Sequence, residues 1–162
     1  KGRAIDVNNA LTGEGPFAPE RSGTLPALSL IDLCFSGKYT HDEMVKYITS
    51  QSGLMAHLGT NDVPVILDRI EQGDLKAKLV LDAMICQIAK GVGALAPVLN
   101  GKVDAILFTG GVANSTYITD RLKERVSFIA PVYIYPGEDE LTALAMNALS
   151  AMRGELEIKD YK

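Results

Sequence analysis

Residues 103–115, Val-Asp-Ala-Ile-Leu-Phe-Thr-Gly-Gly-Val-Ala-Asn-Ser, form the stretch that decides the fold. The apolar run from Val103 to Phe108 predicts a buried strand, two glycines follow it, and Ser115 opens a helical pattern. The glycines allow a ligand to approach the backbone, and the free N–H groups of a helix start attract anions. This suits a nucleotide. The same glycine pair is also typical of a plain strand-to-helix turn, and it is not a Walker A loop because no Gly-Lys-Ser/Thr follows.

The segments after this stretch continue the alternation of strand and helix. We expect a helix over 115–125, a strand over 132–135 and a helix over 140–153. This order predicts an α/β fold with parallel strands, whose ligands gather beyond the carboxyl ends of the strands. The second such end, Pro136–Glu140, carries three carboxylates. They either cap the following helix or help to hold a hydrated magnesium ion.

Upstream of the stretch the sequence predicts mostly helices. We expect helices over 25–35, from Thr40 onward, over 63–72 and over 75–99. Thr40 and Glu43 have the spacing of a capping box, and Asp62 and Asp74 are placed as N-caps. At the start of the chain, 3–8 alternates like a strand that has no partner before it, and natural proteins cover such edges. We therefore expect the chain to be a fragment.

The segment between Asn8 and Thr24 predicts a long, shaped loop. It holds three glycines and two prolines, too many breakers for a regular element. Arg21 lies within it, and an arginine held by such a loop can grip a carboxylate or a phosphate with two parallel hydrogen bonds, although most loop arginines are only solvated.

Composition narrows the class of protein. The chain has 162 residues, enough for one domain with its own core, and a formal charge of −4 from 16 basic and 20 acidic residues. Scattered charges offer no cationic face, so no nucleic-acid partner is expected. Asp82, Gln87 and Lys90 interrupt the apolar run 79–99, which therefore predicts a core helix and no membrane span. Cys34 and Cys86 are expected in the core, which fits a reducing cytoplasm.

Six motifs occur in one order along nearly the whole chain: DVNNAL (6–11), GEGPF (13–17), PERSG (19–23), CFSGKY (34–39), LGTND (58–62) and YPGEDE (135–140). Together they resemble butyrate kinase and its close relatives in the acetate kinase family. The resemblance implies two ribonuclease-H-like halves of the actin-type ATPase superfamily, of which residues 1–162 are the carboxyl-terminal, nucleotide-binding domain. It also implies reversible phosphoryl transfer between ATP and a short-chain carboxylate, giving acyl phosphate and ADP, in a cytoplasmic homo-oligomer that uses Mg²⁺.

The resemblance also assigns site residues. Arg21 corresponds to the loop arginine that stabilises the transferring phosphoryl group. By the same likeness Gly110, Gly111 and Asn114 line the adenosine pocket and Asp62 lies near the ribose. Asp139 or Glu140 corresponds to the acidic position near magnesium. Relatives often carry a basic residue where this chain has Pro64, so a contact to the nucleotide at this position would have to come from the backbone.

Several parts of the family's active site have no counterpart in this sequence. They are the amino-terminal phosphate hairpin, a second catalytic arginine and aspartate, and a glycine-rich phosphate loop. Because phosphoryl transfer depends on positioning and charge, we expect negligible kinase activity from this chain alone. A free-standing module that binds nucleotide or protein without catalysis is the alternative. Butyrate is chosen over branched short-chain acids by family likeness only.

Overall fold

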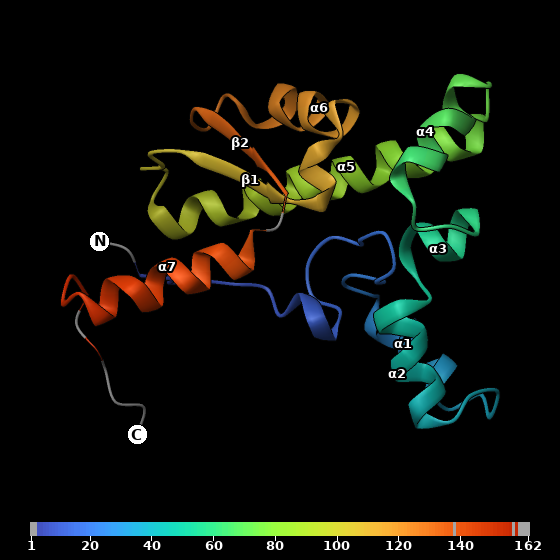
Figure 1. Cartoon of the computed structure of the whole chain (residues 1–162). Helices are drawn as coiled ribbons and strands as arrows, with labels where there is room; N and C mark the ends of the chain where they lie inside the picture. Colours follow the sequence, from blue (N-terminus) through green and yellow to red (C-terminus); the bar gives the residue numbers. More distant parts are fainter. Residues whose placement is uncertain (1–2, 138, 157, 159–162) are drawn as a thin grey trace.

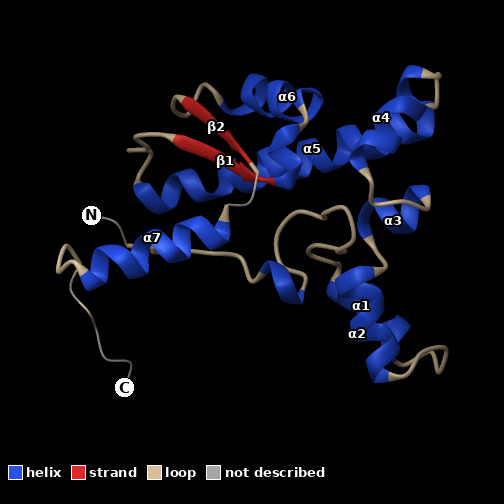
Figure 2. Ribbon diagram, in the orientation of Figure 1, coloured by secondary structure: helices blue, strands red, loops and turns tan. Residues whose placement is uncertain are grey.

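The structure is a computed structural model that describes residues 3–137, 139–156 and 158. Helices dominate it, and two parallel strands form its sheet (Figures 1 and 2). The α-helices are α1 (Ala27–Cys34), α2 (His41–Ser50), α3 (Gly53–Leu58), α4 (Val63–Glu71), α5 (Leu75–Leu95), α6 (Thr116–Val126) and α7 (Glu140–Met152). The strands are β1 (Ile106–Gly110) and β2 (Val132–Pro136), and short 3-10 turns are η1 (Ala10–Thr12), η2 (Ala96–Leu99) and η3 (Gly111–Asn114).

The helix starts predicted from capping residues are confirmed. The Thr40 hydroxyl accepts a hydrogen bond from the Glu43 N–H at 3.3 Å while the Glu43 carboxylate accepts one from the Thr40 N–H at 2.8 Å, which completes the capping box of α2. Asp62 caps α4, and Asp74 caps α5 through the Ala77 N–H at 2.9 Å. These side chains satisfy N–H groups that have no partner inside the helix.

Asp74 also joins two helices. Its carboxylate accepts hydrogen bonds from Arg69 Nε at 3.0 Å and from Arg69 Nη2 at 2.7 Å, and Arg69 Nη1 donates to the Leu58 carbonyl at 2.8 Å. The Ala77 N–H and then the Arg69 guanidinium hold the pKa of Asp74 below its ordinary value. A single aspartate therefore fixes the α4–α5 corner and, through Arg69, the end of α3.

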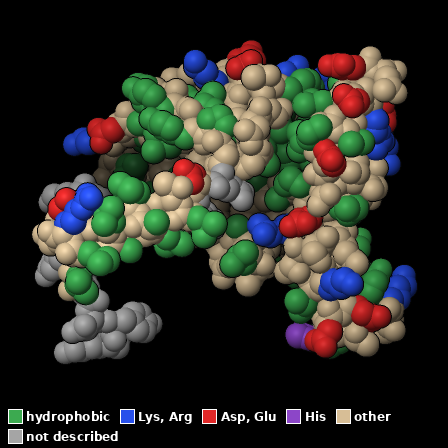
Figure 3. Space-filling view, viewed as in Figure 1, with side chains coloured by type: hydrophobic (Ala, Val, Ile, Leu, Met, Phe, Trp, Pro, Cys, Tyr) green, Lys and Arg blue, Asp and Glu red, His purple; other side chains and the backbone are tan. Residues whose placement is uncertain are grey.

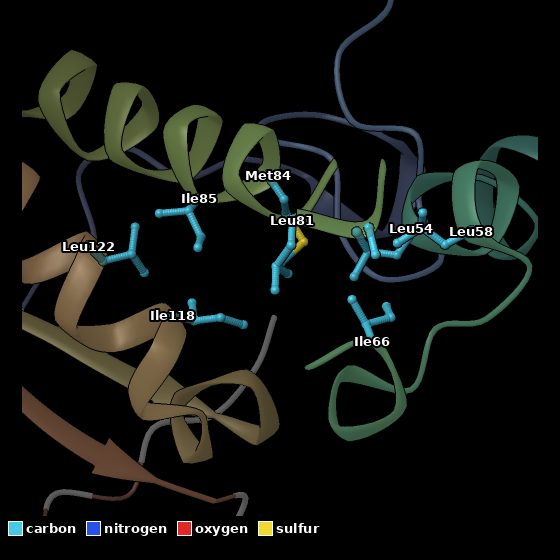
Figure 4. Packing of buried hydrophobic residues seen from close by; sticks show 9 residues of the cluster. Leu54, Leu58, Ile66, Leu81, Met84, Ile85, Ile118 and Leu122 are labelled. Carbon is cyan, nitrogen blue, oxygen red and sulfur yellow. The ribbon is translucent and has the colours of Figure 1, made fainter. Parts of the chain in front are cut away.

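The core lies where α5 meets α3, α4 and α6. Figure 4 shows its side chains converging from these four helices. The fully buried members come from every one of them: Leu54, Ile66, Leu81, Met84, Ile85 and Ile118. A smaller cluster of Ile106, Val126 and Ala130 seats the strand pair. Removing one such large side chain typically costs 2–5 kcal/mol, so this junction is the main source of stability.

The expected parallel sheet is confirmed, although β1 begins three residues later than predicted. Ile106 pairs with Val132 and Gly110 with Pro136 in parallel register. The strand predicted over 3–8 is wrong, because this segment has no described partner strand and lies exposed, with Val7 72% accessible. A strand needs a neighbour to satisfy its backbone groups. The core position predicted for Cys34 is also wrong: Cys34 is exposed and Cys86 is half-buried.

The helix α5 and the turn η2 form one apolar segment. By length and composition Leu75–Leu99, with a mean hydropathy of 1.6, does qualify as a candidate membrane span, contrary to the sequence expectation. Its Ala77, Leu81, Met84 and Ile85 are nevertheless buried against neighbouring helices, as in a core helix. Only 17% of its most apolar window is buried within the described chain. A wide apolar face is thus left uncovered.

Candidate functional site

The carboxyl ends of the two strands are joined by a pair of glycines, Gly110 and Gly137, which we call the glycine junction. Gly110 donates its N–H to the Gly137 carbonyl and accepts the Gly137 N–H in return, both at 3.2 Å. Both glycines have positive φ, +83° and +96°, which side-chain-bearing residues rarely adopt. The turn after β1 therefore lies against the turn after β2. The backbone groups of Gly110 are already engaged in this pair, so a ligand would meet the following residues.

Gly111 and Asn114 form the first and last residues of η3, which leads into α6. Asn114 Nδ2 donates to the Gly111 carbonyl at 2.9 Å, which closes this short turn. Ser115 then caps α6, its Oγ accepting the Ile118 N–H at 3.4 Å. Both Gly111 and Asn114 are exposed, so the turn remains accessible from solvent.

A cavity of about 450 Å³ lies between α4 and α6 next to this turn. Asn114 lines it, whereas Asp62, Gly110 and Gly111 are not among the described residues of its wall. The lining residues are Leu67, Ile70 and Glu71 from α4, and Asn114, Ser115, Thr116, Tyr117 and Asp120 from the other side. We call this the α4–α6 cavity. Its volume falls within the range of about 300–1,000 Å³ that small-molecule sites occupy.

Asp62 lies at the opposite end of α4 from Glu71. Its Oδ1 accepts the Val65 N–H at 3.3 Å, and its own N–H donates to Thr60 Oγ1 at 3.1 Å. The neighbouring Asn61 side chain reaches Glu20 Oε2 at 3.3 Å. The loop that carries Asp62 is therefore connected to the loop that carries Arg21.

Backbone hydrogen bonds fix the loop of Arg21. The Arg21 carbonyl accepts the Ala18 N–H at 3.0 Å, and the Ser22 N–H donates to the Ile48 carbonyl of α2 at 2.9 Å. The start of α3 binds the other side of the loop, since the Ser52 N–H donates to the Glu20 carbonyl at 3.0 Å. Arg21 itself is half-buried and makes no ion pair among the described residues. The backbone at Arg21 is thus fixed, while its guanidinium has no carboxylate partner among the described residues.

Asp139 occupies the N-cap position of α7, directly after the glycine junction. Its side chain is exposed and makes no cap hydrogen bond, so the carboxylate is available. The two other predicted carboxylates, the residue Glu138 and the side chain of Glu140, lie outside the described residues. Magnesium is commonly held by one or two carboxylates together with substrate phosphates, a requirement that Asp139 fits. The described residues contain no cluster of three or more metal-binding side chains.

The predicted residues thus fall into two groups. Gly110, Gly111, Asn114 and Asp139 gather at the carboxyl edge of the strand pair. Arg21 and Asp62 belong to the loops around α3, linked to each other through Glu20 and Asn61. Among the described residues, no hydrogen bond or ion pair joins the two groups directly.

One cluster beside the cavity escaped the sequence interpretation. On α5, Asp82 accepts hydrogen bonds from Lys78 at 2.5 Å and from the Tyr117 hydroxyl at 3.0 Å, and Arg121 lies 3.7 Å away. Burial alone would raise the pKa of Asp82, but the bonds from Lys78 and Tyr117 outweigh it and hold the pKa below its ordinary value. The i, i+4 spacing of Lys78 and Asp82 was visible in the sequence. Tyr117, 35 residues away, was not predictable as a partner.

Asp82→Asn is expected to lower the free energy of unfolding by up to about 1 kcal/mol at pH 7. Because the folded pKa of Asp82 is depressed, its charge stabilises the fold fully above the ordinary value of 3.8, and this contribution is lost as the pH falls through the folded pKa. Urea melts of both proteins between pH 3 and 7 measure the difference. If the difference in free energy of unfolding between the two proteins were the same at every pH in this range, the prediction would be contradicted. Asp104→Asn, an exposed site on the 101–105 loop, is the control.

The sequence of this chain is similar to those of known kinases. The chain is 62% identical over 161 residues to a probable butyrate kinase of Bacteroides thetaiotaomicron, and 53% identical over 162 residues to one of Phocaeicola vulgatus. These alignments cover 99% and 100% of this chain but 46% of each relative. The chain therefore spans less than half the length of these curated relatives.

Solved structures establish the fold. Porphyromonas gingivalis acetate kinase superposes with a TM-score of 0.72 at 24% identity, covering 84% of this chain and 41% of that structure. Entamoeba histolytica acetate kinase gives a TM-score of 0.70 at 22% identity, covering 83% and 42%. The fold is thus the α/β, actin-type ATPase fold of these kinases. The model of the Acetokinase family matches residues 1–137, and the chain belongs to this family.

Proposed function

We propose that this chain is the nucleotide-binding, carboxyl-terminal half of a two-domain butyrate kinase. The whole enzyme would reversibly transfer the γ-phosphoryl group of ATP to butyrate or a branched short-chain fatty acid, giving acyl phosphate and ADP. The observation that carries the proposal is the glycine junction at the carboxyl edge of β1 and β2, beside the α4–α6 cavity. Identity of 62% to a probable butyrate kinase along 99% of the chain supports the choice of reaction.

The proposed roles of the site residues are those that the family resemblance implies. Asn114 and the exposed glycine turn would contact the nucleoside. Asp139 or Glu140 would hold the magnesium ion, which when bound neutralises charge on the phosphate oxygens. Arg21, whose loop backbone is fixed and which has no carboxylate partner in the part of the chain that the structure describes, would stabilise the transferring phosphoryl group. Asp62 acts on α4 as a cap, so any contact with the ribose would be an additional role.

The exposed apolar surface supports the view that this is half of a larger kinase. Helix α7 packs extensively against no other described element, and Figure 3 shows hydrophobic side chains along it. Leu141 is 84% exposed and Met152 85%. A helix that is apolar all round is normally buried. We propose that α7 is covered by the remaining part of the kinase, which the relatives contain and which has no counterpart in this chain.

Homo-oligomerisation in the cytoplasm is part of the same proposal. The sequence indicates Gly91 and Gly93 of α5 as residues that permit close packing. A Cβ at Gly91 would lie 3.3 Å from Pro16 Cγ, so this glycine already serves packing within the chain. At Gly93 such a Cβ would meet no atom of the described residues within 4 Å. A subunit contact on α5 would therefore use the Gly93 side.

Two measurements on the purified chain test the proposal. Isothermal titration with ATP and Mg²⁺ is expected to show binding, and a hydroxamate assay with butyrate is expected to show negligible acyl phosphate. A fusion of this chain to the part of the Bacteroides thetaiotaomicron relative that has no counterpart in it is expected to show butyrate kinase activity. Binding of ATP with no activity in the joined protein would favour a free-standing binding module instead.

A further inference from the structure

We propose that Glu20 and Asn61 are positioning residues that hold the loop of Arg21 in its working place. They would fix this loop relative to the loop of Asp62. The inference rests on the proposed function, in which Arg21 stabilises the transferring phosphoryl group. The observation that carries it is the hydrogen bond from Asn61 Nδ2 to Glu20 Oε2 at 3.3 Å, which joins the two loops across 41 positions of sequence.

Helix α3 spans the space between the two loops, and its first turn lies directly on the loop of Arg21. Three N–H groups at the start of the helix donate to carbonyls of this loop: Ser52 to Glu20 at 3.0 Å, Leu54 to Ala18 at 3.3 Å and Met55 to Pro19 at 2.9 Å. N–H groups in this position have no partner inside their own helix. The loop supplies the partners, so loop and helix are bound to each other along the backbone.

The other end of α3 leads into the loop of Asp62. The helix ends at Leu58, whose carbonyl accepts a hydrogen bond from Arg69 Nη1 at 2.8 Å, and Gly59 turns the chain with φ at +76°. Asp62 follows three residues later and caps α4. Both ends of this short loop are therefore anchored on helices, and Asn61 lies within it.

The bond between Glu20 and Asn61 closes these parts into a ring. One side of the ring is α3, and the other is the pair of side chains that bridges the two loops. Without the bond, the loop of Arg21 would stay attached through its backbone but would be placed less precisely. Phosphoryl transfer depends on positioning, and a displacement of about 1 Å can cost about a hundredfold in rate. The ring therefore matters more for turnover than for folding.

The test uses the fusion of this chain to the part of its relative that has no counterpart in it. Glu20→Ala is expected to lower the turnover number by about tenfold, with little change in the urea midpoint, because Asn61 is exposed. Glu20→Gln keeps an oxygen that accepts the Asn61 N–H and should retain most of the turnover. Asp42→Ala is the matched control, since it removes an exposed carboxylate that pairs with the neighbouring His41.

Two further combinations distinguish positioning from a local structural role. Asn61→Asp places two carboxylates together and is expected to lower turnover as Glu20→Ala does. Adding Glu20→Gln to it should restore the bond with donor and acceptor exchanged, and the turnover with it. In an Arg21→Ala background, Glu20→Ala should cause no further loss, because Glu20 acts through Arg21.

The outcomes separate this inference from the proposed function. Equal turnover of the Glu20→Ala and Asp42→Ala proteins overturns the inference and leaves the proposed function standing. A further tenfold loss from Glu20→Ala in the Arg21→Ala background also overturns it, since Glu20 would then act independently of Arg21. If the fusion has no butyrate kinase activity, both fall. Should Glu20→Ala fail to fold by circular dichroism, unaltered turnover of the Asn61→Asp protein overturns the inference.

Discussion

Gly53→Ala is expected to destabilise the fold by at least about 2 kcal/mol and to displace the loop of Arg21. Gly53 begins α3 with φ at +61°, and a Cβ there would collide with the Ala18 carbonyl oxygen and lie 2.8 Å from that of Arg21. Neither oxygen can move freely, because the Leu54 N–H binds the first and the Ala18 N–H binds the second. Thermal or urea unfolding followed by circular dichroism measures the loss.

Gly59→Ala is the matched control at the other end of α3. Gly59 has a similar φ of +76°, but a Cβ there meets no atom within 4 Å. It therefore carries only the cost of the left-handed backbone, about 1–2 kcal/mol. Equal destabilisation by the two substitutions would show that the contact with the Arg21 loop contributes nothing.

Arg21→Ala is expected to lower the turnover of the completed kinase by about a thousandfold or more. A positive charge placed on the transferring phosphoryl group is worth about 10³–10⁵ in rate in related reactions. Arg21→Lys should keep part of the charge effect but lose the two parallel hydrogen bonds that a guanidinium provides. The measurement is acyl phosphate formation by the chain joined to the missing part of its relative.

The stability of the Arg21 variants should stay close to that of the unchanged protein, because the hydrogen bonds of this loop come from its backbone. Arg125→Ala is the control, since Arg125 is exposed near the end of α6. A loss of activity of less than tenfold in Arg21→Ala would remove Arg21 from the proposed mechanism.

Sequence reasoning succeeded where the determinants are local. The caps at Thr40, Asp62 and Asp74 and the order of strand and helix after Val103 follow from neighbouring residues, and the structure confirms them. The family resemblance is confirmed as well. Helix α3 was missed, since it is only six residues long and Ser52 makes no side-chain cap.

Features that depend on distant residues were not predictable. A strand at 3–8 requires a partner, and an alternating pattern alone does not supply one. The links from Asn61 to Glu20 and from Tyr117 to Asp82 join residues 41 and 35 positions apart. The assignments of Arg21, Asp62, Gly110, Gly111, Asn114, Asp139 and Glu140 to catalysis, nucleotide and metal stay predictions.

The isolation of α7 has a consequence for the energetics of assembly. A 13-residue helix is marginal in water without packing, so the amide hydrogens of α7 should exchange with solvent far faster than those of α5. Association with the rest of the kinase would then order this helix while burying its leucines and methionines. Such coupled ordering produces a large negative heat-capacity change and weakens the association by the conformational entropy lost.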